Sequence, residues 1–197
     1  MNGSPDTRRR GSVLEAAIFD AVWEELAEHG YAGLTVAKVA ERAATSKPVL
    51  YRRWPNRAHL VYAALASRHR TITPPDTGSL RADLLDLMSA VVRVSTNVTP
   101  DVLWGLLAES AGDSALAATV RDELVDMLPE QLAATVVAHA EERGELSPRP
   151  RSARELTLPF DLIRSEFFAR GRVNPEAIQE ILDQVALPLL RQPSGAS

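Results

Sequence analysis

Basic and aromatic side chains crowd a short stretch of the chain, KPVLYRRWPNR, which runs from Lys47 to Arg57. Residues 31–60 hold six basic side chains and a single acidic one, Glu41. Arg side chains form bidentate hydrogen bonds to guanine, and both Lys and Arg bind phosphates. This stretch could therefore recognise a polyanion. The competing interpretation is a solvated basic surface, which runs of charge usually are.

Two short helices joined by a tight turn are predicted to position these side chains. Thr35 caps a helix that runs to about Ala43, and its inner face carries Val36, Val39 and Ala40. Ser46 caps a second helix that starts at Lys47. Pro48 falls in the first turn of this helix, where its missing N–H removes no needed hydrogen bond. The spacing of the two helices is that of a helix-turn-helix.

The second helix separates into two faces at 100° per residue. Leu50 and Trp54 point in nearly the same direction and are predicted to dock on the preceding helices. The opposite face carries Arg52, which could contact guanine, and Val49, which could contact a thymine methyl. The remaining members of the outward set are Pro48 and the flanking phosphate binders Lys47, Tyr51 and Arg53.

Residues 12–65 resemble the DNA-binding domain of the tetracycline-repressor (TetR) family. The resemblance lies in Gly30-Tyr31, then LTVAKVAERA, then SKPVLYRRWPNRAHL. Three positions depart from the family pattern. The turn reads Ala43-Ala44-Thr45-Ser46 where Ala-Gly-Val-Ser is common, and Ala costs energy if the second position needs a positive φ. Val49 replaces a common Thr, and Arg57 replaces the usual Lys and keeps its charge.

The resemblance implies double-stranded DNA as a partner. It also implies a fourth helix that links the DNA-binding domain, called the head below, to the remaining C-terminal helices, called the body. Arg57, at the start of that helix, would then reach a phosphate beside free backbone N–H groups. The predicted DNA-binding residues are Thr35, Lys47, Pro48, Val49, Tyr51, Arg52, Arg53 and Arg57.

The N-terminal region is predicted to contain a tail and one long helix. Residues 1–11 are expected to lack fixed structure, with Arg8–Arg10 either an arm that reaches DNA or a solvated tail. Ser12 and Glu15 have the spacing of a capping box, so a helix is expected from Ser12 to His29, with Gly30 as its stop.

An all-α protein follows from the pattern of the remaining chain. Thr71–Gly78, TITPPDTG, is the best domain boundary. We expect a helix-turn-helix domain at 12–70 and a helical ligand-binding and dimerisation domain at 79–191. Predicted helices cover 57–70, 79–97, 102–110, 113–143 with a break or kink at Pro129, 152–169 and 175–190. The last two are apolar and suit pairing with a second copy, although burial within one subunit would also explain them.

Composition limits the compartment and the partners. The chain has no cysteine and no apolar run long enough to cross a bilayer, and no secretory signal is recognisable. The net charge of −4 divides into +4 for residues 1–70 and −8 for residues 71–197. Only the head therefore suits a polyanion. We expect a cytoplasmic protein, at the bacterial nucleoid when it is bound to DNA, with no membrane partner.

Catalytic, cofactor and metal sites are not predicted, because the chain has no GxSxG, no Walker loop, no HExxH and no glycine-rich dinucleotide turn. The resemblance implies a pocket for a small apolar or amphipathic effector in the C-terminal helices. Its candidate walls, for each of which plain core packing competes, are Met88, Trp104, Leu107, Met127, His139, Phe160 and Phe167, with Glu109 or Arg164 as polar anchors.

The sequence thus predicts a homodimeric transcriptional regulator, a repressor that an unknown small molecule releases from an inverted repeat. Two alternatives stay open. One is an all-helical dimer that binds a small molecule or a protein without reading DNA sequence. The other is a helical enzyme with an unrecognised site. The sequence identifies neither the effector nor the operator.

Overall fold

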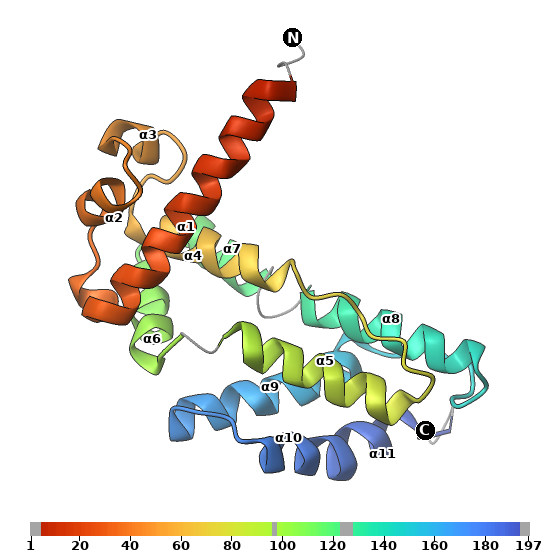
Figure 1. Cartoon of the computed structure of the whole chain (residues 1–197). Coiled ribbons are helices and arrows are strands. Elements are labelled where there is room, and N and C mark those ends of the chain that lie inside the picture. The colour runs from red at the N-terminus through yellow and green to blue at the C-terminus, as the bar shows by residue number, and fades with distance from the viewer. Residues whose placement is uncertain (1–4, 96–97, 123–127, 194–197) are drawn as a thin grey trace. The chain divides into compact units, whose positions relative to one another are not determined.

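The computed structural model describes residues 5–95, 98–122 and 128–193, and every regular element in these ranges is a helix (Figure 1). The all-α prediction is confirmed. The helices form two compact units. Unit 1 lies within residues 1–67 and 97–117, and unit 2 lies within residues 68–96 and 118–197.

Unit 1 is built from α1 (Pro5–Gly33), α2 (Val36–Arg42), α3 (Lys47–Tyr51), most of α4 (Arg57–His69) and α6 (Pro100–Ser110), and α7 (Ser114–Thr119) begins in it. Its core is an apolar cluster from successive helices. The fully buried side chains include Ile18, Val22, Leu34, Val39, Leu50, Leu60, Val61 and Leu106. The predicted helices at 35–43, 47–54 and 57–70 are found within two or three residues of their expected bounds.

Helix α1 starts earlier than predicted. It begins at Pro5, so the expectation that residues 5–11 lack fixed structure is wrong, and Ser12 lies inside the helix instead of capping it. The physical reason is that nothing after Pro5 stops a helix. Proline fits a first turn, arginine favours helix, and Gly11 costs only about 1 kcal/mol there. The predicted stop is correct, because Gly30 has a φ of 64° and a ψ of −178°, which are not helical.

Helix α6 packs on α1 although 66 residues separate Gly33 from Pro100. Thr99 precedes the helix in an extended conformation and Pro100 occupies its first turn, so the helix starts two residues before the predicted 102. Val102 and Leu106 are buried in unit 1. Residues 97–117 therefore join the head unit by packing. Whether residues 12–70 and 79–191 fold as separate domains stays a prediction.

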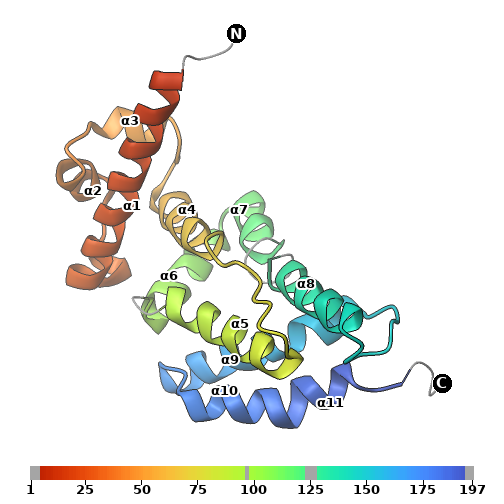
Figure 2. The same ribbon diagram turned by 45° about the vertical axis from the view of Figure 1, so that its right-hand side comes forward.

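Unit 2 consists of α5 (Leu80–Val94), α8 (Leu128–Glu142), α9 (Ala153–Arg170), α10 (Pro175–Ile181), the π-helical segment η2 (Leu182–Ala186) and α11 (Leu187–Leu190). Figure 2 shows α5 between α8 and the pair formed by α9 and α10. These helices share one core, whose most buried members include Leu80, Leu87, Met88, Val136, Ala140, Leu182 and Ala186.

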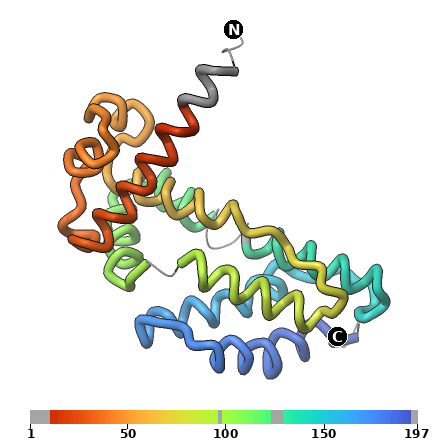
Figure 3. Tube along the Cα trace, in the orientation of Figure 1, coloured from red at the N-terminus to blue at the C-terminus, as the bar shows by residue number. Residues whose placement is uncertain are grey.

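The extended segment between α4 and α5 is held by charged side chains of unit 2, and Figure 3 traces its path. Asp83 is fully buried and accepts hydrogen bonds from the backbone N–H and the hydroxyl of Thr77, both at 2.6 Å. Arg143 donates to the other Asp83 oxygen at 2.8 Å and also pairs with Asp76. These contacts attach the segment to α5 and to the end of α8.

Two prolines shape the second half of unit 2. Pro129 lies in the first turn of α8, where a proline is tolerated, and α7 ends ten residues earlier, at Thr119. Residues 123–127 lie outside the described residues, so the break or kink expected at Pro129 stays a prediction. The single helix expected over 175–190 is instead α10, η2 and α11. Pro188 cannot donate to the carbonyl of Gln184, and its ring crowds that carbonyl. The wider π turn that contains Gln184 accommodates both effects.

Candidate nucleic-acid interface

The turn between α2 and α3 contains a strained residue. The Thr35 hydroxyl accepts a hydrogen bond from the Lys38 N–H at 3.3 Å and so caps α2, as predicted. Ala44 then adopts a φ of +49°, in the left-handed region. This is the turn position where the family pattern has glycine, so the turn does require a positive φ. An Ala there costs about 1 kcal/mol or slightly more.

Helix α3 docks through the two side chains that the helical wheel selects. Leu50 is 0% exposed and Trp54 is 8% exposed. The Trp54 ring lies 5.6 Å from the Phe19 ring of α1, centroid to centroid, at an angle of 55°. Ser46 precedes the helix as predicted, but its hydroxyl makes no capping bond, and its backbone carbonyl accepts from Val49 N–H at 3.0 Å instead.

The predicted DNA-reading side chains lie away from that docking face. Lys47, Pro48 and Arg52 are exposed, Tyr51 is 50% exposed, and Val49 is half-buried. Arg52 caps the C-terminal end of α3 and so lies at its edge, since the helix proper ends at Tyr51. An exposed cation beside an exposed phenol on a docked helix can contact phosphates and base edges.

Arg53 turns back toward α1. Its guanidinium forms an ion pair with Glu15 and lies 5.1 Å from the centroid of the Trp54 ring. The same side chains border an open groove of about 460 Å³ in unit 1, lined by Gly11, Ser12, Glu15, Ala16, Phe19, Arg53 and Ser67. Neither the ion pair nor the groove was predicted. A phosphate would have to compete with Glu15 for this arginine.

Arg57 contacts two side chains of unit 1, Glu109 and Tyr31. Its Nε donates to Glu109 of α6 at 2.7 Å, and its guanidinium carbon lies 4.8 Å from the centroid of the Tyr31 ring. The hydrogen bond to Glu109 is the main reason that the pKa of Arg57 is raised. Glu109 also accepts the Tyr31 hydroxyl at 3.1 Å. Because Glu109 lies 52 positions after Arg57 in the sequence, no local sequence pattern signals this contact.

Arg42 is not free to face DNA, because it clamps α2 onto α1. It donates to Glu24, Glu25 and Glu28 over distances of 2.8–3.0 Å. This hydrogen bonding raises the pKa of Arg42, and its bond to Glu28 lowers the pKa of that carboxyl. Of the six basic side chains in residues 31–60, Arg42, Arg53 and Arg57 therefore hold carboxylates. The other three, Lys38, Lys47 and Arg52, are exposed.

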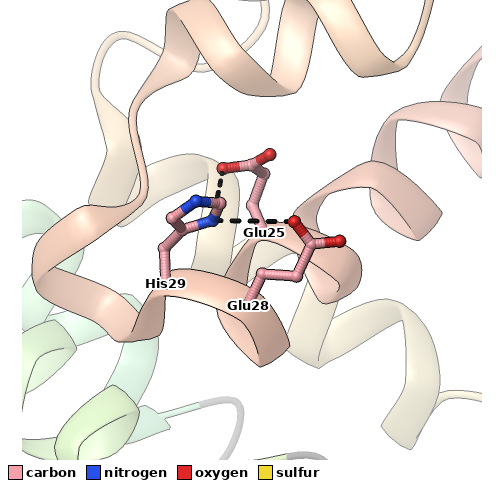
Figure 4. Close-up of side chains that lie close together, drawn as sticks. All are labelled: Glu25, Glu28 and His29. Atoms are coloured by element: carbon pink, nitrogen blue, oxygen red, sulfur yellow. Dashed lines mark ion pairs between the residues drawn. The ribbon is translucent and has the colours of Figure 1, made fainter.

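Glu25, Glu28 and His29 lie close enough to hold a metal ion, as Figure 4 shows. Arg42, however, occupies three of the four carboxylate oxygens of Glu25 and Glu28. The fourth, Glu25 Oε2, lies 3.3 Å from His29 Nδ1. Glu25 is only 3% exposed, so its charge is balanced by Arg42 inside the fold. This cluster is a structural clamp.

The predicted effector residues are divided between the two units. Met88 and Phe160 are buried in the core of unit 2, and Phe167 packs against Phe168 with centroids 6.2 Å apart. His139 is half-buried with its Nδ1 4.0 Å from Asp76, and Arg164 pairs with Asp161. Trp104 and Leu107 are exposed on α6 of unit 1, at 57% and 42%. Met127 lies outside the described residues. The effector pocket stays a prediction.

Comparison with known proteins identifies the family. Residues 18–64 match the family described as "Bacterial regulatory proteins, tetR family", and residues 74–185 match "Tetracyclin repressor-like, C-terminal domain". The chain belongs to the TetR family of transcriptional regulators. These are DNA-binding proteins of the helix-turn-helix type and not enzymes, so the recognition from sequence is confirmed and the enzyme alternative is excluded.

Relatives support this assignment along most of the chain. An uncharacterized HTH-type transcriptional regulator of Mycobacterium tuberculosis is 35% identical over 187 residues, which cover 93% of this chain and 91% of that one. A "DNA-binding transcriptional repressor TetR" of Mycobacteroides abscessus is 32% identical over 119 residues, 59% of this chain and 63% of that protein. The crystal structure of the TetR family transcription regulator SCO0332 is 26% identical, with a TM-score of 0.65 over 88% of this chain and 96% of that one.

In this TetR family chain, none of the helices in the described residues is long and apolar enough to cross a membrane.

Proposed function

We propose that this TetR family regulator is a homodimeric repressor that binds an inverted repeat through α3. The observation that supports the proposal is the split of α3 into a docked side, Leu50 and Trp54, and an exposed side that carries Arg52 beside Lys47 and Tyr51. Arg52 reads guanine, and Pro48 and Val49 touch bases. The flanking residues that hold the phosphate backbone are Thr35, Lys47, Tyr51, Arg53 and Arg57.

Repression is proposed on two grounds. The relative of Mycobacteroides abscessus is named a repressor, and its similarity covers more than half of this chain. A dimer that occupies an inverted repeat also blocks the DNA on which it sits. The chromosomal target places the protein in the cytoplasm, at the nucleoid when it is bound.

Base readout is tested with a duplex obtained by in vitro selection and a random-sequence duplex, both followed by fluorescence anisotropy. Arg52→Ala is expected to weaken the selected duplex about tenfold or more and the random duplex much less, because each lost base contact costs about 1–3 kcal/mol. Arg154→Ala, an exposed arginine of α9 in unit 2, is the matched control. Equal losses on both duplexes would remove Arg52 from base readout. No preference of the wild type for any selected sequence would favour the alternative of a binding protein without DNA readout.

Dimerisation is proposed through α9 and the α10–α11 segment. Their side chains that stay half-buried in the single chain include Leu158, Leu162, Phe167, Phe168, Val185 and Leu189. A second copy would complete the burial of this apolar set, as in a four-helix bundle. Leu189→Glu is expected to shift sedimentation toward the monomer, whereas Gln184→Glu on an exposed site of η2 should leave it unchanged. Circular dichroism separates dissociation from unfolding.

Release by an effector completes the proposed cycle. A small apolar or amphipathic molecule would bind within the C-terminal helices and change the separation of the two recognition helices. Two half-sites one turn of DNA apart require a separation of about 34–36 Å, so a modest rotation abolishes simultaneous contact. Titration of the protein–duplex complex with a panel of such molecules tests this step. The expected result is release by a subset of the panel at concentrations that leave the fold intact.

A further inference from the structure

Tyr31 lies along one side of α6 and contacts three successive turns of that helix. Its backbone N–H donates to Asp101 at 3.2 Å, and its hydroxyl donates to Glu109 at 3.1 Å. Between them, Gly105 leaves room for the ring, because a Cβ at this position would lie 2.2 Å from a ring carbon. Asp101, Gly105 and Glu109 are four residues apart, so they share one face of α6. The phenol is therefore fixed relative to that helix.

Arg57 is enclosed by Tyr31 and by the last of these α6 residues. The Tyr31 ring stacks against the guanidinium, Glu109 accepts from Nε, and the carbonyls of Tyr31 and Ala32 accept from Nη1 at 3.4 Å. The Arg57 side chain is 35% exposed. The Glu109 carboxylate thus accepts hydrogen bonds from both the Tyr31 hydroxyl and the Arg57 guanidinium.

The geometry limits how Arg57 can bind a phosphate. A guanidinium grips an oxyanion with two parallel N–H groups, either Nε with Nη2 or Nη1 with Nη2. The first pair is blocked at Nε by Glu109 at 2.7 Å. The second pair is weakened at Nη1 by the two carbonyls. A phosphate on the first edge would also lie next to the Glu109 carboxylate, and like charges at that distance repel.

We propose that Glu109 competes with DNA phosphate for Arg57 and thereby lowers the affinity of this regulator for every duplex. The inference rests on the proposed function, in which Arg57 contacts the DNA backbone. Glu109 is then a negative determinant of DNA affinity that lies on α6, outside the helix-turn-helix. Its effect is independent of sequence, because phosphates carry no base information.

The test is Glu109→Gln in the full-length chain, with affinities for the random and the selected duplex measured by fluorescence anisotropy at several salt concentrations. Removal of a partly exposed ion pair is expected to tighten binding about three- to fivefold per head. The gain should be equal on both duplexes. The dependence of log affinity on log salt should steepen by about one per head, because Arg57 then releases its own counterion on binding.

Two controls separate this competition from a general loss of negative charge. Asp113→Asn removes the same charge one turn beyond Glu109, where its neighbour is His59 at 3.7 Å, and should change affinity far less than Glu109→Gln. In an Arg57→Ala background, Glu109→Gln should have no effect, which a double-mutant cycle measures directly.

The measured affinities distinguish failure of the proposed competition from failure of the proposed function. Weaker binding by Glu109→Gln would mean that Glu109 positions Arg57 for the phosphate, and would overturn the proposed competition. A change equal to that of Asp113→Asn, or one that persists without Arg57, would overturn it as well. In both cases the wild type still binds its selected duplex, so the proposed function survives. Failure of the wild type to bind either duplex refutes the proposed function itself, and the competition with it.

Discussion

Gly105→Ala sets two effects of known size against each other at the contact between α6 and Tyr31. Inside a helix, alanine is more favourable than glycine by about 0.8–1 kcal/mol. The added Cβ, however, would lie 2.2, 2.6 and 2.8 Å from three atoms of the Tyr31 ring. Overpacking of this kind costs about 1–3 kcal/mol when the neighbour cannot yield.

The Tyr31 ring cannot easily move away from an added Cβ. The residue is 4% exposed and is held by Asp101, Glu109 and Arg57. A Cβ only 2.2 Å from a ring carbon places the steric cost in the upper part of its range, about 2–3 kcal/mol. After the gain in helix propensity is subtracted, the expected net loss of unfolding free energy is about 1–2 kcal/mol. For a chain of this size that corresponds to a fall in melting temperature of roughly 2–8 °C.

The matched control is Gly11→Ala in α1, where a Cβ would meet no atom within 4 Å. Only the propensity term operates there, so this variant should gain about 0.5–1 kcal/mol. Thermal and urea unfolding followed by circular dichroism measures both variants. A gain of stability at Gly105 equal to the gain at Gly11 would refute the argument, because it would mean that the Tyr31 ring moves away at no cost.

Further variants test other elements of the fold. Ala44→Gly should raise the unfolding free energy by about 0.5–1 kcal/mol, since glycine adopts the observed φ of +49° without strain, while Ala37→Gly inside α2 should lower it by a similar amount. Loss of stability on Ala44→Gly would contradict the assignment of strain. Glu155 pairs with Arg149 at 2.5 Å, and this hydrogen bond is the largest cause of the lowering of its pKa to about 2. A folded-state pKa below the ordinary value of 4.5 stabilises the fold above about pH 4.5, and this stabilisation is lost as the pH falls toward about 2. The melting temperatures of the wild type and Glu155→Gln should therefore differ at neutral pH and converge near pH 2, and a difference that is constant with pH would exclude the charge as its origin.

The parts of the head that sequence predicts are those governed by local rules. Leu50 and Trp54 follow from helical periodicity, and the need for a positive φ at Ala44 follows from the family's glycine at that turn. Thr35 caps α2 through its hydroxyl, because N-cap preference depends on a few neighbouring residues. The capping box at Ser12 was a wrong local prediction, since a continuous helix from Pro5 uses the same residues.

The partners of the arginines could not be predicted in this way. Arg42, Arg53 and Arg57 count as positive charge in the sequence, but in the fold each holds a carboxylate that is 14 to 52 residues distant. Such pairs depend on how helices cross, and hydrophobic periodicity does not specify a crossing. The same limit explains why α6 was assigned to the body. Its apolar pattern shows that one side is buried, and leaves open which helix covers that side.

The packing of α6 has a practical consequence for the construction of hybrid regulators. A cut at the loop that starts at Thr71 looks natural in the sequence and would transfer residues 1–70 to a foreign body. The transplanted head would then lose the helix that covers Tyr31 and supplies Glu109 to Arg57. Two apolar side chains of α6, Val102 and Leu106, would be absent from its core as well. A graft that carries residues 97–117 along with the head, or that restores Asp101, Gly105 and Glu109 in the recipient helix, keeps the interface intact.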